Sequence, residues 1–288
     1  MSNYVIYTDS ACDIVPSKLE EWGVEHVSLA FRFNHIDHDF LNDDMPIKEF
    51  YQNMRDGYVA KTNAVNAETF RALFEPTVAA GNDILYLGFS SGLSTTYNQG
   101  RLAAEELCAL YPDRKIITVD TLSASAGFGL LLKLTVDKKN EGATLEEAAA
   151  YAESLVHKLA HWFTVEDLVY LKRGGRVSPA TALVGNILSI KPVLHMDDEG
   201  HLIKVSTARG RKASLKALAD KLFETADDPV NGKIFISHGD CLEDAEYLAN
   251  MIKERGGNDV EIITNVGAVI GAHSGPGTMA LFFVASQR

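Results

Sequence analysis

Short apolar segments that end in hydrogen-bonding residues recur along this chain, and helical patterns follow them. In the first half they lie at residues 4–7, 84–87 and 116–119, and helical patterns are clearest at about 94–110 and 121–140. Short buried strands that alternate with helices are typical of parallel βαβ units. We therefore predict an α/β fold with parallel and mixed sheets flanked by helices. Ligands in such folds bind at the carboxyl ends of the strands.

A long helical pattern at about 144–160 precedes a change in composition, and Thr144 with Glu147 forms a capping box at its start. Residues 172–178 are basic and turn-rich, and a chain of 288 residues is long enough for two modest domains. We predict an N-terminal α/β domain at 1–162 and a C-terminal α/β domain at 163–288. In the second we expect a hairpin of strands 191–196 and 202–206, helices at 211–226 and 241–255, and strands at 234–237, 260–263 and 281–284.

The charge balance argues against binding to nucleic acid through the whole surface. The chain has 27 basic and 39 acidic residues and a net charge of −12, which repels polyanions. Its three cysteines, Cys12, Cys108 and Cys241, are widely spaced and indicate neither a disulfide framework nor a thiolate metal site. No apolar run approaches the ~18 residues of a membrane span, and no leader pattern is visible. We expect a cytoplasmic protein that contacts membranes at most transiently.

The junction at 84–98 runs from an apolar strand into a cluster of hydroxyls and glycines, and a helical pattern follows. The N–H groups at a helix start lack partners inside the helix, and the helix dipole is positive there. Such a junction is suited to a carboxylate or a phosphate. Ser90 and Ser91 are the candidate ligands, and we favour Ser91 because it lies nearer the expected helix start.

The same junction also fits the nucleophile elbow of α/β-hydrolases. Residues 88–92 read Gly-Phe-Ser-Ser-Gly, and Ser90, Asp120 and His273 follow the hydrolase order. A helix cap, an anion-binding loop or ordinary turn chemistry explains the same pattern, and no second glycine-rich segment of the oxyanion-loop type is present. A serine hydrolase stays as the alternative function, and a regulator that binds a phosphorylated metabolite is a third, weaker one.

Two further polar segments carry candidate ligand contacts. Thr62 and Asn63 precede a helix that Asn66 is placed to cap, and a loop hydroxyl can donate to a ligand oxygen. His273 and Ser274 stand among glycines and a proline, which let a ligand approach the backbone closely. We interpret His273 as a functional residue in a loop.

Other charged and metal-like groups are weaker signals. His35 and His38 with neighbouring aspartates, and His157 and His161 as an i, i+4 helical pair, lack an evident third ligand, so we expect no metal. The usual glycine-loop nucleotide motifs are missing, so we expect no nucleotide cofactor. Clusters of basic residues also occur in this acidic chain. They form either a solvated face or a binding site for a phosphate or an acidic partner, and they comprise Lys172, Arg173, Arg176, Arg209, Arg211 and Lys212.

Six motifs in order make the chain resemble the DegV family of bacterial fatty-acid-binding proteins, which serve as acyl carriers for fatty acid kinase. They are Thr8-Asp9-Ser10 with Asp13, the loop 62–66, the serine loop 90–97, Asp120-Thr121 with Ser123, Gly174 to Ser178, and His273 to Gly277. The chain departs from the family at Thr95, where glycine is common, and at Ser274, where threonine is typical. Both departures keep a small or hydroxylated residue.

The resemblance implies a two-domain fold with a long-chain fatty acid between the domains and no cofactor. A separate ATP-dependent fatty acid kinase would phosphorylate the carboxylate, so this chain would have no turnover of its own. Because they belong to the basic clusters of a chain of net charge −12, we expect Arg173, Arg176 and Arg209 to face the partner or the transferring phosphate. The residues around the carboxylate would be Thr62, Asn63, Ser90, Ser91, His273 and Ser274. We expect these neutral donors to leave the carboxylate reactive, whereas an arginine clamp would quench it.

Overall fold

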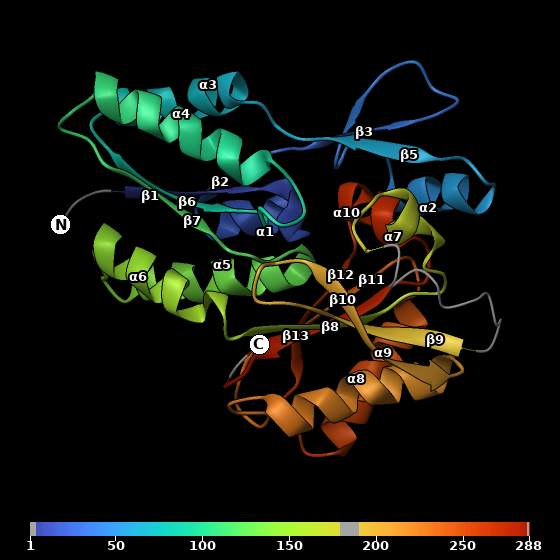
Figure 1. The fold of residues 1–288 in the computed structure, drawn as a ribbon. Coiled ribbons are helices and arrows are strands. Elements are labelled where there is room, and N and C mark those ends of the chain that lie inside the picture. Colours follow the sequence, from blue (N-terminus) through green and yellow to red (C-terminus); the bar gives the residue numbers. More distant parts are fainter. Residues whose placement is uncertain (1–3, 179–189, 287) are drawn as a thin grey trace.

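The computed structural model describes residues 4–178, 190–286 and 288, and Figure 1 shows the path of the chain. In this part of the chain the strands form three sheets, which we name the parallel sheet, the mixed sheet and the small sheet. Within the same residues no helix is long and apolar enough to cross a membrane.

The parallel sheet has four strands in the order β2-β1-β6-β7, as the alternation predicts. Its strands are β1 (Tyr4–Asp9), β2 (Val24–Val27), β6 (Asp83–Gly88) and β7 (Ile116–Asp120). Helices α3 (Ala67–Ala79) and α4 (Thr96–Leu110) lie above it in Figure 1, and α5 (Ser125–Asn140) and α6 (Leu145–Val156) lie below. The short helices η1 (Ser10–Cys12) and α1 (Pro16–Glu21) follow β1. Helices therefore cover both faces of this sheet.

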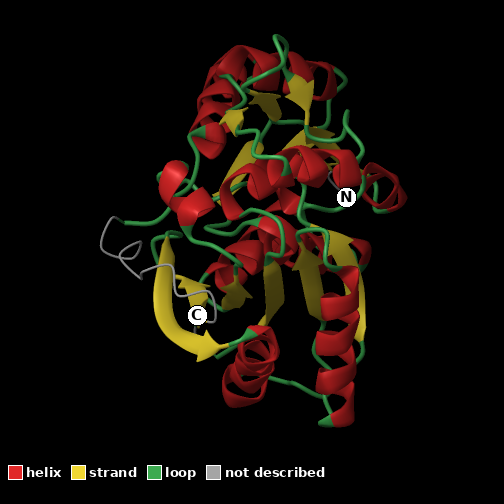
Figure 2. Cartoon of the chain, turned by 90° about the vertical axis from the view of Figure 1, so that its right-hand side faces the viewer, coloured by secondary structure: helices red, strands yellow, loops and turns green. Residues whose placement is uncertain are grey.

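The mixed sheet has six strands in the order β10-β9-β8-β13-β11-β12. They are β8 (Leu159–Thr164), β9 (Ile190–Met196), β10 (Leu202–Arg209), β11 (Ile234–His238), β12 (Val260–Asn265) and β13 (Met279–Val284). The predicted β9–β10 hairpin is confirmed, as are the helices that follow, α8 (Arg211–Thr225) and α9 (Leu242–Glu254). Helix α5 contacts β8, β11 and β13, so it lies between the parallel and mixed sheets. In Figure 2 helices separate the upper and lower groups of strands.

The predicted helix at 144–160 is too long. Helix α6 ends at Val156 with His157 as its C-cap, and β8 begins at Leu159. His157 and His161 are therefore not a helical pair, because His161 lies in a strand. Strand β8 also spans the predicted domain boundary at residue 162. The division into domains at this residue stays a prediction.

The small sheet, in the order β4-β3-β5, is absent from the sequence prediction. It contains β3 (Ala30–Phe33), β4 (Phe40–Leu41) and β5 (Ala60–Asn63), and α2 (Ile47–Arg55) packs beside it. Its aromatic core includes Phe31, Phe33 and Phe50, and it continues into Ala268 and Ala272 of α10 (Ala268–Ser274). Residues 30–63 are thus packed against a helix from the far end of the chain.

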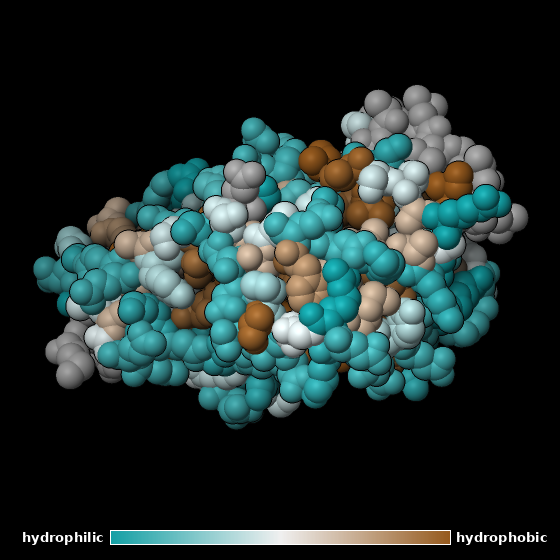
Figure 3. Space-filling view, turned by 90° about the horizontal axis from the view of Figure 1, so that it is seen from below, coloured by the Kyte–Doolittle hydropathy of each residue, from teal (hydrophilic) through white to brown (hydrophobic). Residues whose placement is uncertain are grey.

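The face formed by α8 and α9 is seen from below in Figure 3. It is mainly hydrophilic, and its apolar side chains occur in small patches. Among the exposed apolar residues are Val230, Leu242 and Tyr247. The mainly hydrophilic colouring is that of a solvated outer face.

Candidate functional site

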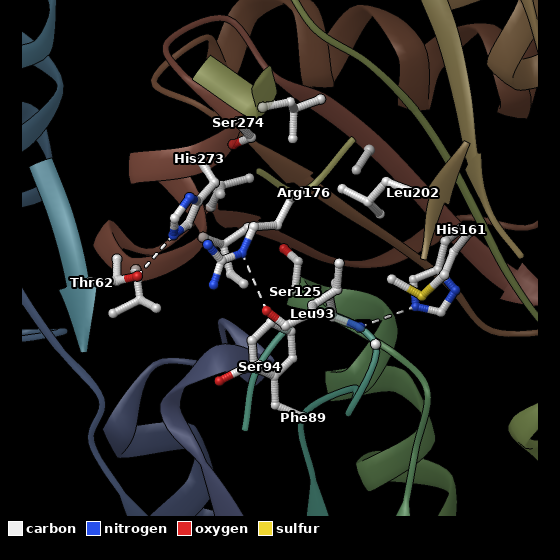
Figure 4. Close-up of a pocket in the computed structure, with 18 of the residues that line it drawn as sticks. Thr62, Phe89, Leu93, Ser94, Ser125, His161, Arg176, Leu202, His273 and Ser274 are labelled. Atoms are coloured by element: carbon white, nitrogen blue, oxygen red, sulfur yellow. Dashed lines mark hydrogen bonds between the residues drawn. The ribbon is translucent and has the colours of Figure 1, made fainter. Parts of the chain in front are cut away.

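A cavity of about 500 Å³ lies where the serine loop 89–95, α10 and the inner side of the mixed sheet meet. Its wall is mainly apolar and includes Phe89, Val266 and Phe282. Figure 4 shows the polar side chains that interrupt this wall, with Thr62 and His273 at one side and His161 at the other. Thr62 and His273 therefore mark one polar end of a cavity whose wall is mainly apolar.

Thr62 and His273 form a hydrogen-bonded pair at that polar end. They are 211 residues apart in the chain, and Thr62 Oγ1 lies 2.8 Å from His273 Nε2. Thr62 is in β5, while His273 and Ser274 occupy the last turn of α10, so the expectation that His273 stands in a loop is wrong. The core that the small sheet shares with α10 brings the two residues together.

The imidazole of His273 is neutral at neutral pH. Burial, and then the nearby charge of Arg176, lowers its pKa to about 4. Its Nδ1 is buried without a partner among the described residues, against Gly174. A neutral imidazole carries one N–H, and an N–H without an acceptor is costly to bury. We infer that Nε2–H donates to Thr62, which leaves the Thr62 hydroxyl proton free for a ligand.

Two further groups enlarge the polar end. Ser274 lines the cavity, and its Oγ is buried without a hydrogen-bond partner in the described chain. Arg176 also lines the cavity; its Nε donates to Leu93 O at 3.2 Å and its Nη1 donates to Gly174 O. Burial lowers the pKa of Arg176, but a guanidinium keeps its charge. No carboxylate of the described residues is paired with it, so its charge is available to an anion.

Arg173 and Arg209 lie apart from Arg176. Both are exposed and neither lines the cavity, and the Arg173 guanidinium stands over the Tyr170 ring. From the sequence we expected all three arginines to face the partner or the transferring phosphate. The structure separates Arg176 from the other two because its neighbours Gly174 and Leu93 hold it at the cavity wall.

The serine loop places its two candidate serines differently. Ser91 is exposed and lines the cavity, as does the exposed Asn63, and the Ser91 N–H donates to Asp120 Oδ1 at 3.2 Å. Ser90 is fully buried and outside the lining, and its Oγ donates to Gly200 O at 3.0 Å. Helix α4 begins only at Thr96, so the helix start does not explain the role expected for Ser91.

The three residues of the hydrolase alternative have separate partners. Ser90 is bonded to Gly200, and Asp120 accepts the N–H groups of Ser91 and Leu122. His273 is bonded to Thr62. This arrangement gives Ser90 no adjacent base in the described structure, and among the described residues no group of three or more His, Cys, Asp or Glu is placed to hold a metal.

Three polar residues of the cavity wall are not among the ligand contacts predicted from the sequence. Ser125, His161 and Ser237 line the cavity away from Thr62. Burial holds the pKa of His161 well below its usual range, and its Nδ1 lies 3.0 Å from Leu159 O. Ser125 begins α5, and Ser237 sits in an apolar strand, so neither has a motif around it. The only available signal was their position at the carboxyl end of a strand or the start of a helix.

An α/β chain whose buried, mainly apolar cavity ends in unused hydrogen-bond donors and a cation has the features of a protein that binds an amphipathic anion. The model of the DegV family, described as an uncharacterised protein family, matches residues 3–286. The chain therefore belongs to the DegV family.

Relatives support this assignment over the whole chain. A DegV domain-containing protein of Clostridium perfringens is 41% identical over 289 residues, which are 100% of this chain and 99% of the relative. A DegV family protein of Thermus thermophilus, described as fatty-acid binding, has 26% identity and a TM-score of 0.88 over 98% of this chain and 99% of its own. A Thermotoga maritima protein whose structure "reveals fatty acid binding function" has 28% identity and a TM-score of 0.83, covering 99% and 100%.

Proposed function

We propose that this protein binds a long-chain fatty acid in the cavity and presents its carboxylate to a separate ATP-dependent kinase, which forms the acyl phosphate. The observation that carries the proposal is the asymmetry of the cavity. Its wall is mainly apolar, while one end holds Thr62, Ser274 and Arg176, a cation that no carboxylate of the described residues neutralises. The fatty-acid binding described for the Thermus and Thermotoga relatives supports the same ligand class.

The apolar wall supplies the affinity. Burying a 16-carbon tail at about 0.8 kcal/mol per CH₂ gives on the order of 10 kcal/mol before the costs of ordering the ligand. A buried carboxylate loses its hydration, and each charge-assisted hydrogen bond offsets about 1.5–3 kcal/mol of that loss. The polar end therefore fixes the direction of the ligand more than its affinity.

We place the carboxylate between Thr62 and Ser274, with His273 behind Thr62. Ser274 Oγ has no hydrogen-bond partner among the described residues, and Thr62 keeps its hydroxyl proton if His273 Nε2–H donates to it. Arg176 adds a positive charge that the expectation of purely neutral donors did not include. Asn63 and Ser91 stand at the exposed rim, where the head group meets solvent and an incoming partner. Ser90 ties the serine loop to the β9–β10 turn, because its Oγ donates to Gly200 O.

The kinase is a separate protein in this proposal. The sequence lacks the glycine-loop nucleotide motifs, so ATP is supplied by a partner. Arg173 and Arg209 are exposed on a chain of net charge −12, and we assign them to docking of that partner. Exposed charges of this kind act on association rate and specificity more than on fatty-acid affinity.

The binding step is tested by titrating delipidated protein with C14–C18 fatty acids in a calorimeter. Thr62→Val keeps the side-chain shape and removes the hydroxyl, and we expect it to weaken binding about 10-fold, the equivalent of about 1.4 kcal/mol. Thr225→Val is the matched control, because Thr225 donates to Lys221 O in α8 and does not line the cavity. Delipidated protein that binds none of these acids contradicts the proposal.

The presentation step needs a second measurement. With a fatty acid kinase and ATP, we expect acyl phosphate to form only when the kinase and the loaded protein are both present. Acyl phosphate made by this protein and ATP alone would show that the chain has its own kinase activity. Tight fatty-acid binding without phosphorylation by any fatty acid kinase would limit the function to binding.

A further inference from the structure

The cavity wall holds a pair of hydroxyl groups away from the Thr62–His273 end. Ser125 stands at the start of α5 and Ser237 lies in β11, and both line the cavity. Ser125 is 5% exposed and Ser237 is 0% exposed, and their Oγ atoms are 2.9 Å apart. In Figure 4 Ser125 lies between the Thr62–His273 pair and His161. Two hydroxyls therefore interrupt a wall that a plain hydrocarbon tail would otherwise contact.

Behind this pair stands a buried carboxyl group. Asp13 is 6% exposed, and its Oδ2 is bonded to the Oγ of Ser125. Burial is the main cause that raises the pKa of Asp13 to about 8, and the hydrogen bond of Ser125 opposes it. At neutral pH the carboxyl group is therefore mostly protonated, and the three oxygens form the chain Asp13–Ser125–Ser237.

The Ser237 end of this chain of oxygens has unused hydrogen-bonding capacity. The protonated carboxyl and the two hydroxyls carry three protons, but only two hydrogen bonds join their oxygens. Ser125 Oγ donates to Asp13 Oδ2, and among the described residues Ser237 Oγ has no hydrogen-bond partner other than Ser125. A buried hydroxyl with unused hydrogen-bonding capacity is unfavourable, and Ser237 is one of the residues that line the cavity.

We propose that Ser125 and Ser237 form a subsite for an oxygen atom carried on the acyl chain, so that hydroxy or oxo fatty acids are ligands of this protein. The inference rests on the proposed function, because it requires a fatty-acid tail that runs along the cavity from the polar end. A chain oxygen placed elsewhere faces apolar wall such as Phe89 or Phe282 and loses its hydrogen bonds to water. Binding therefore depends on the position of the oxygen along the chain.

The test is a positional series of ligands on the delipidated full-length protein. Stearic acid and its monohydroxy isomers, substituted at successive carbons from mid-chain to the far end, compete with a fluorescent fatty acid. We expect one isomer, or two adjacent ones, to bind about 2- to 10-fold more tightly than stearic acid, and the others to bind more weakly. If every monohydroxy isomer binds more weakly than stearic acid, the proposed subsite is wrong.

Variants link that preference to the named residues. Ser237→Ala removes the hydroxyl, and we expect the ratio of the Kd for stearic acid to the Kd for the favoured isomer to fall to about 1 in this variant. Ser237→Cys keeps the volume with a poor donor and gives the same fall in this ratio. Ser214→Ala is the matched control, because Ser214 is 0% exposed, donates to Arg211 O and does not line the cavity.

The outcomes separate the two claims. A preference that persists in Ser237→Ala and Ser237→Cys overturns the subsite while fatty-acid binding stands. Failure of the wild type to bind stearic acid or any isomer overturns both the subsite and the proposed function. The isomer series on the wild type gives its answer whether or not the variants fold.

Discussion

Replacing Gly174 by alanine displaces the ring of His273 without straining the backbone. Gly174 ends α7 (Val169–Arg173) with φ −73° and ψ −12°, which is a conformation that alanine adopts readily. A Cβ at this position stands 2.1 Å from His273 Nδ1, whereas ordinary contacts begin at 3.4 Å. In a close-packed interior the ring has to yield by about the difference, roughly 1 Å or more.

The displacement acts on the 2.8 Å contact between His273 Nε2 and Thr62 Oγ1. A shift of this size breaks the hydrogen bond, and the freed Thr62 hydroxyl is no longer oriented toward a carboxylate. Losing this orientation removes about 1.4–2.8 kcal/mol of head-group stabilisation, so we expect the fatty-acid Kd to rise about 10- to 100-fold. The fold itself loses about 1–3 kcal/mol from overpacking.

The neighbouring Gly175 provides the control. It has φ +70° and no atom within 4 Å of an added Cβ, so Gly175→Ala strains the backbone by about 1–2 kcal/mol without touching His273. Calorimetric titration and thermal melting should therefore show a raised Kd for Gly174→Ala and mainly a lowered Tm for Gly175→Ala. A Gly174→Ala protein with wild-type Kd would refute the assignment of the Thr62–His273 pair to the carboxylate.

Three other expectations follow from the same structure. A fluorophosphonate probe should leave Ser90 unlabelled, and stoichiometric labelling that His273→Ala abolishes would restore the hydrolase alternative. Burial raises the pKa of Asp13 from 3.8 to about 8, so the folded state holds a proton that the unfolded state releases and stability falls as pH rises through this window. The free energy of unfolding, measured in urea, should therefore change less between pH 5 and 8 in Asp13→Asn than in the wild type. An equal change in both proteins would contradict a raised pKa of Asp13. Arg173→Glu should slow kinase-dependent phosphorylation in a salt-sensitive way and leave the fatty-acid Kd unchanged, whereas a collapse of binding would place Arg173 at the ligand.

Local signals in the sequence were sufficient for much of the fold. The capping box of Thr144 and Glu147 is present, and Asn66 caps α3 by accepting the Thr69 N–H at 2.9 Å. The apolar runs at 84–87 and 116–119 pair as neighbouring parallel strands because each is short, apolar and followed by a helix. Each of these features is decided by residues a few positions apart.

Features that depend on distant residues were missed. The small sheet gains its core from Ala268 and Ala272, which lie more than two hundred residues beyond Phe31 and Phe33. The end of α6 was misplaced for a different reason. Residues 156–158 hold neither glycine nor proline, so the helical pattern seemed to continue to residue 160, although β8 begins at Leu159.

In the candidate site, too, the features decided by nearby residues were predicted and those that depend on distant residues were missed. Thr62 and His273 each drew notice from their own polar surroundings, but their contact exists only because the small sheet packs on α10. Ser90 looked available because its loop is polar, and the turn of the β9–β10 hairpin covers it through Gly200. The only signal for Ser237 was its position near the carboxyl end of a strand, and a single serine in a buried strand is common.

Arg176 reconciles two demands that the proposed function makes on the polar end of the cavity. A buried carboxylate needs compensating charge, yet a tight bidentate clamp would hold both of its oxygens and oppose attack on a phosphoryl donor. Arg176 already donates from Nε to Leu93 O and from Nη1 to Gly174 O, so part of its donor capacity is used by the backbone. It can lower the cost of burying the charge without closing around the head group. On this proposal the hydroxyls of Thr62 and Ser274 orient the carboxylate, and an oxygen lone pair stays available for phosphoryl transfer.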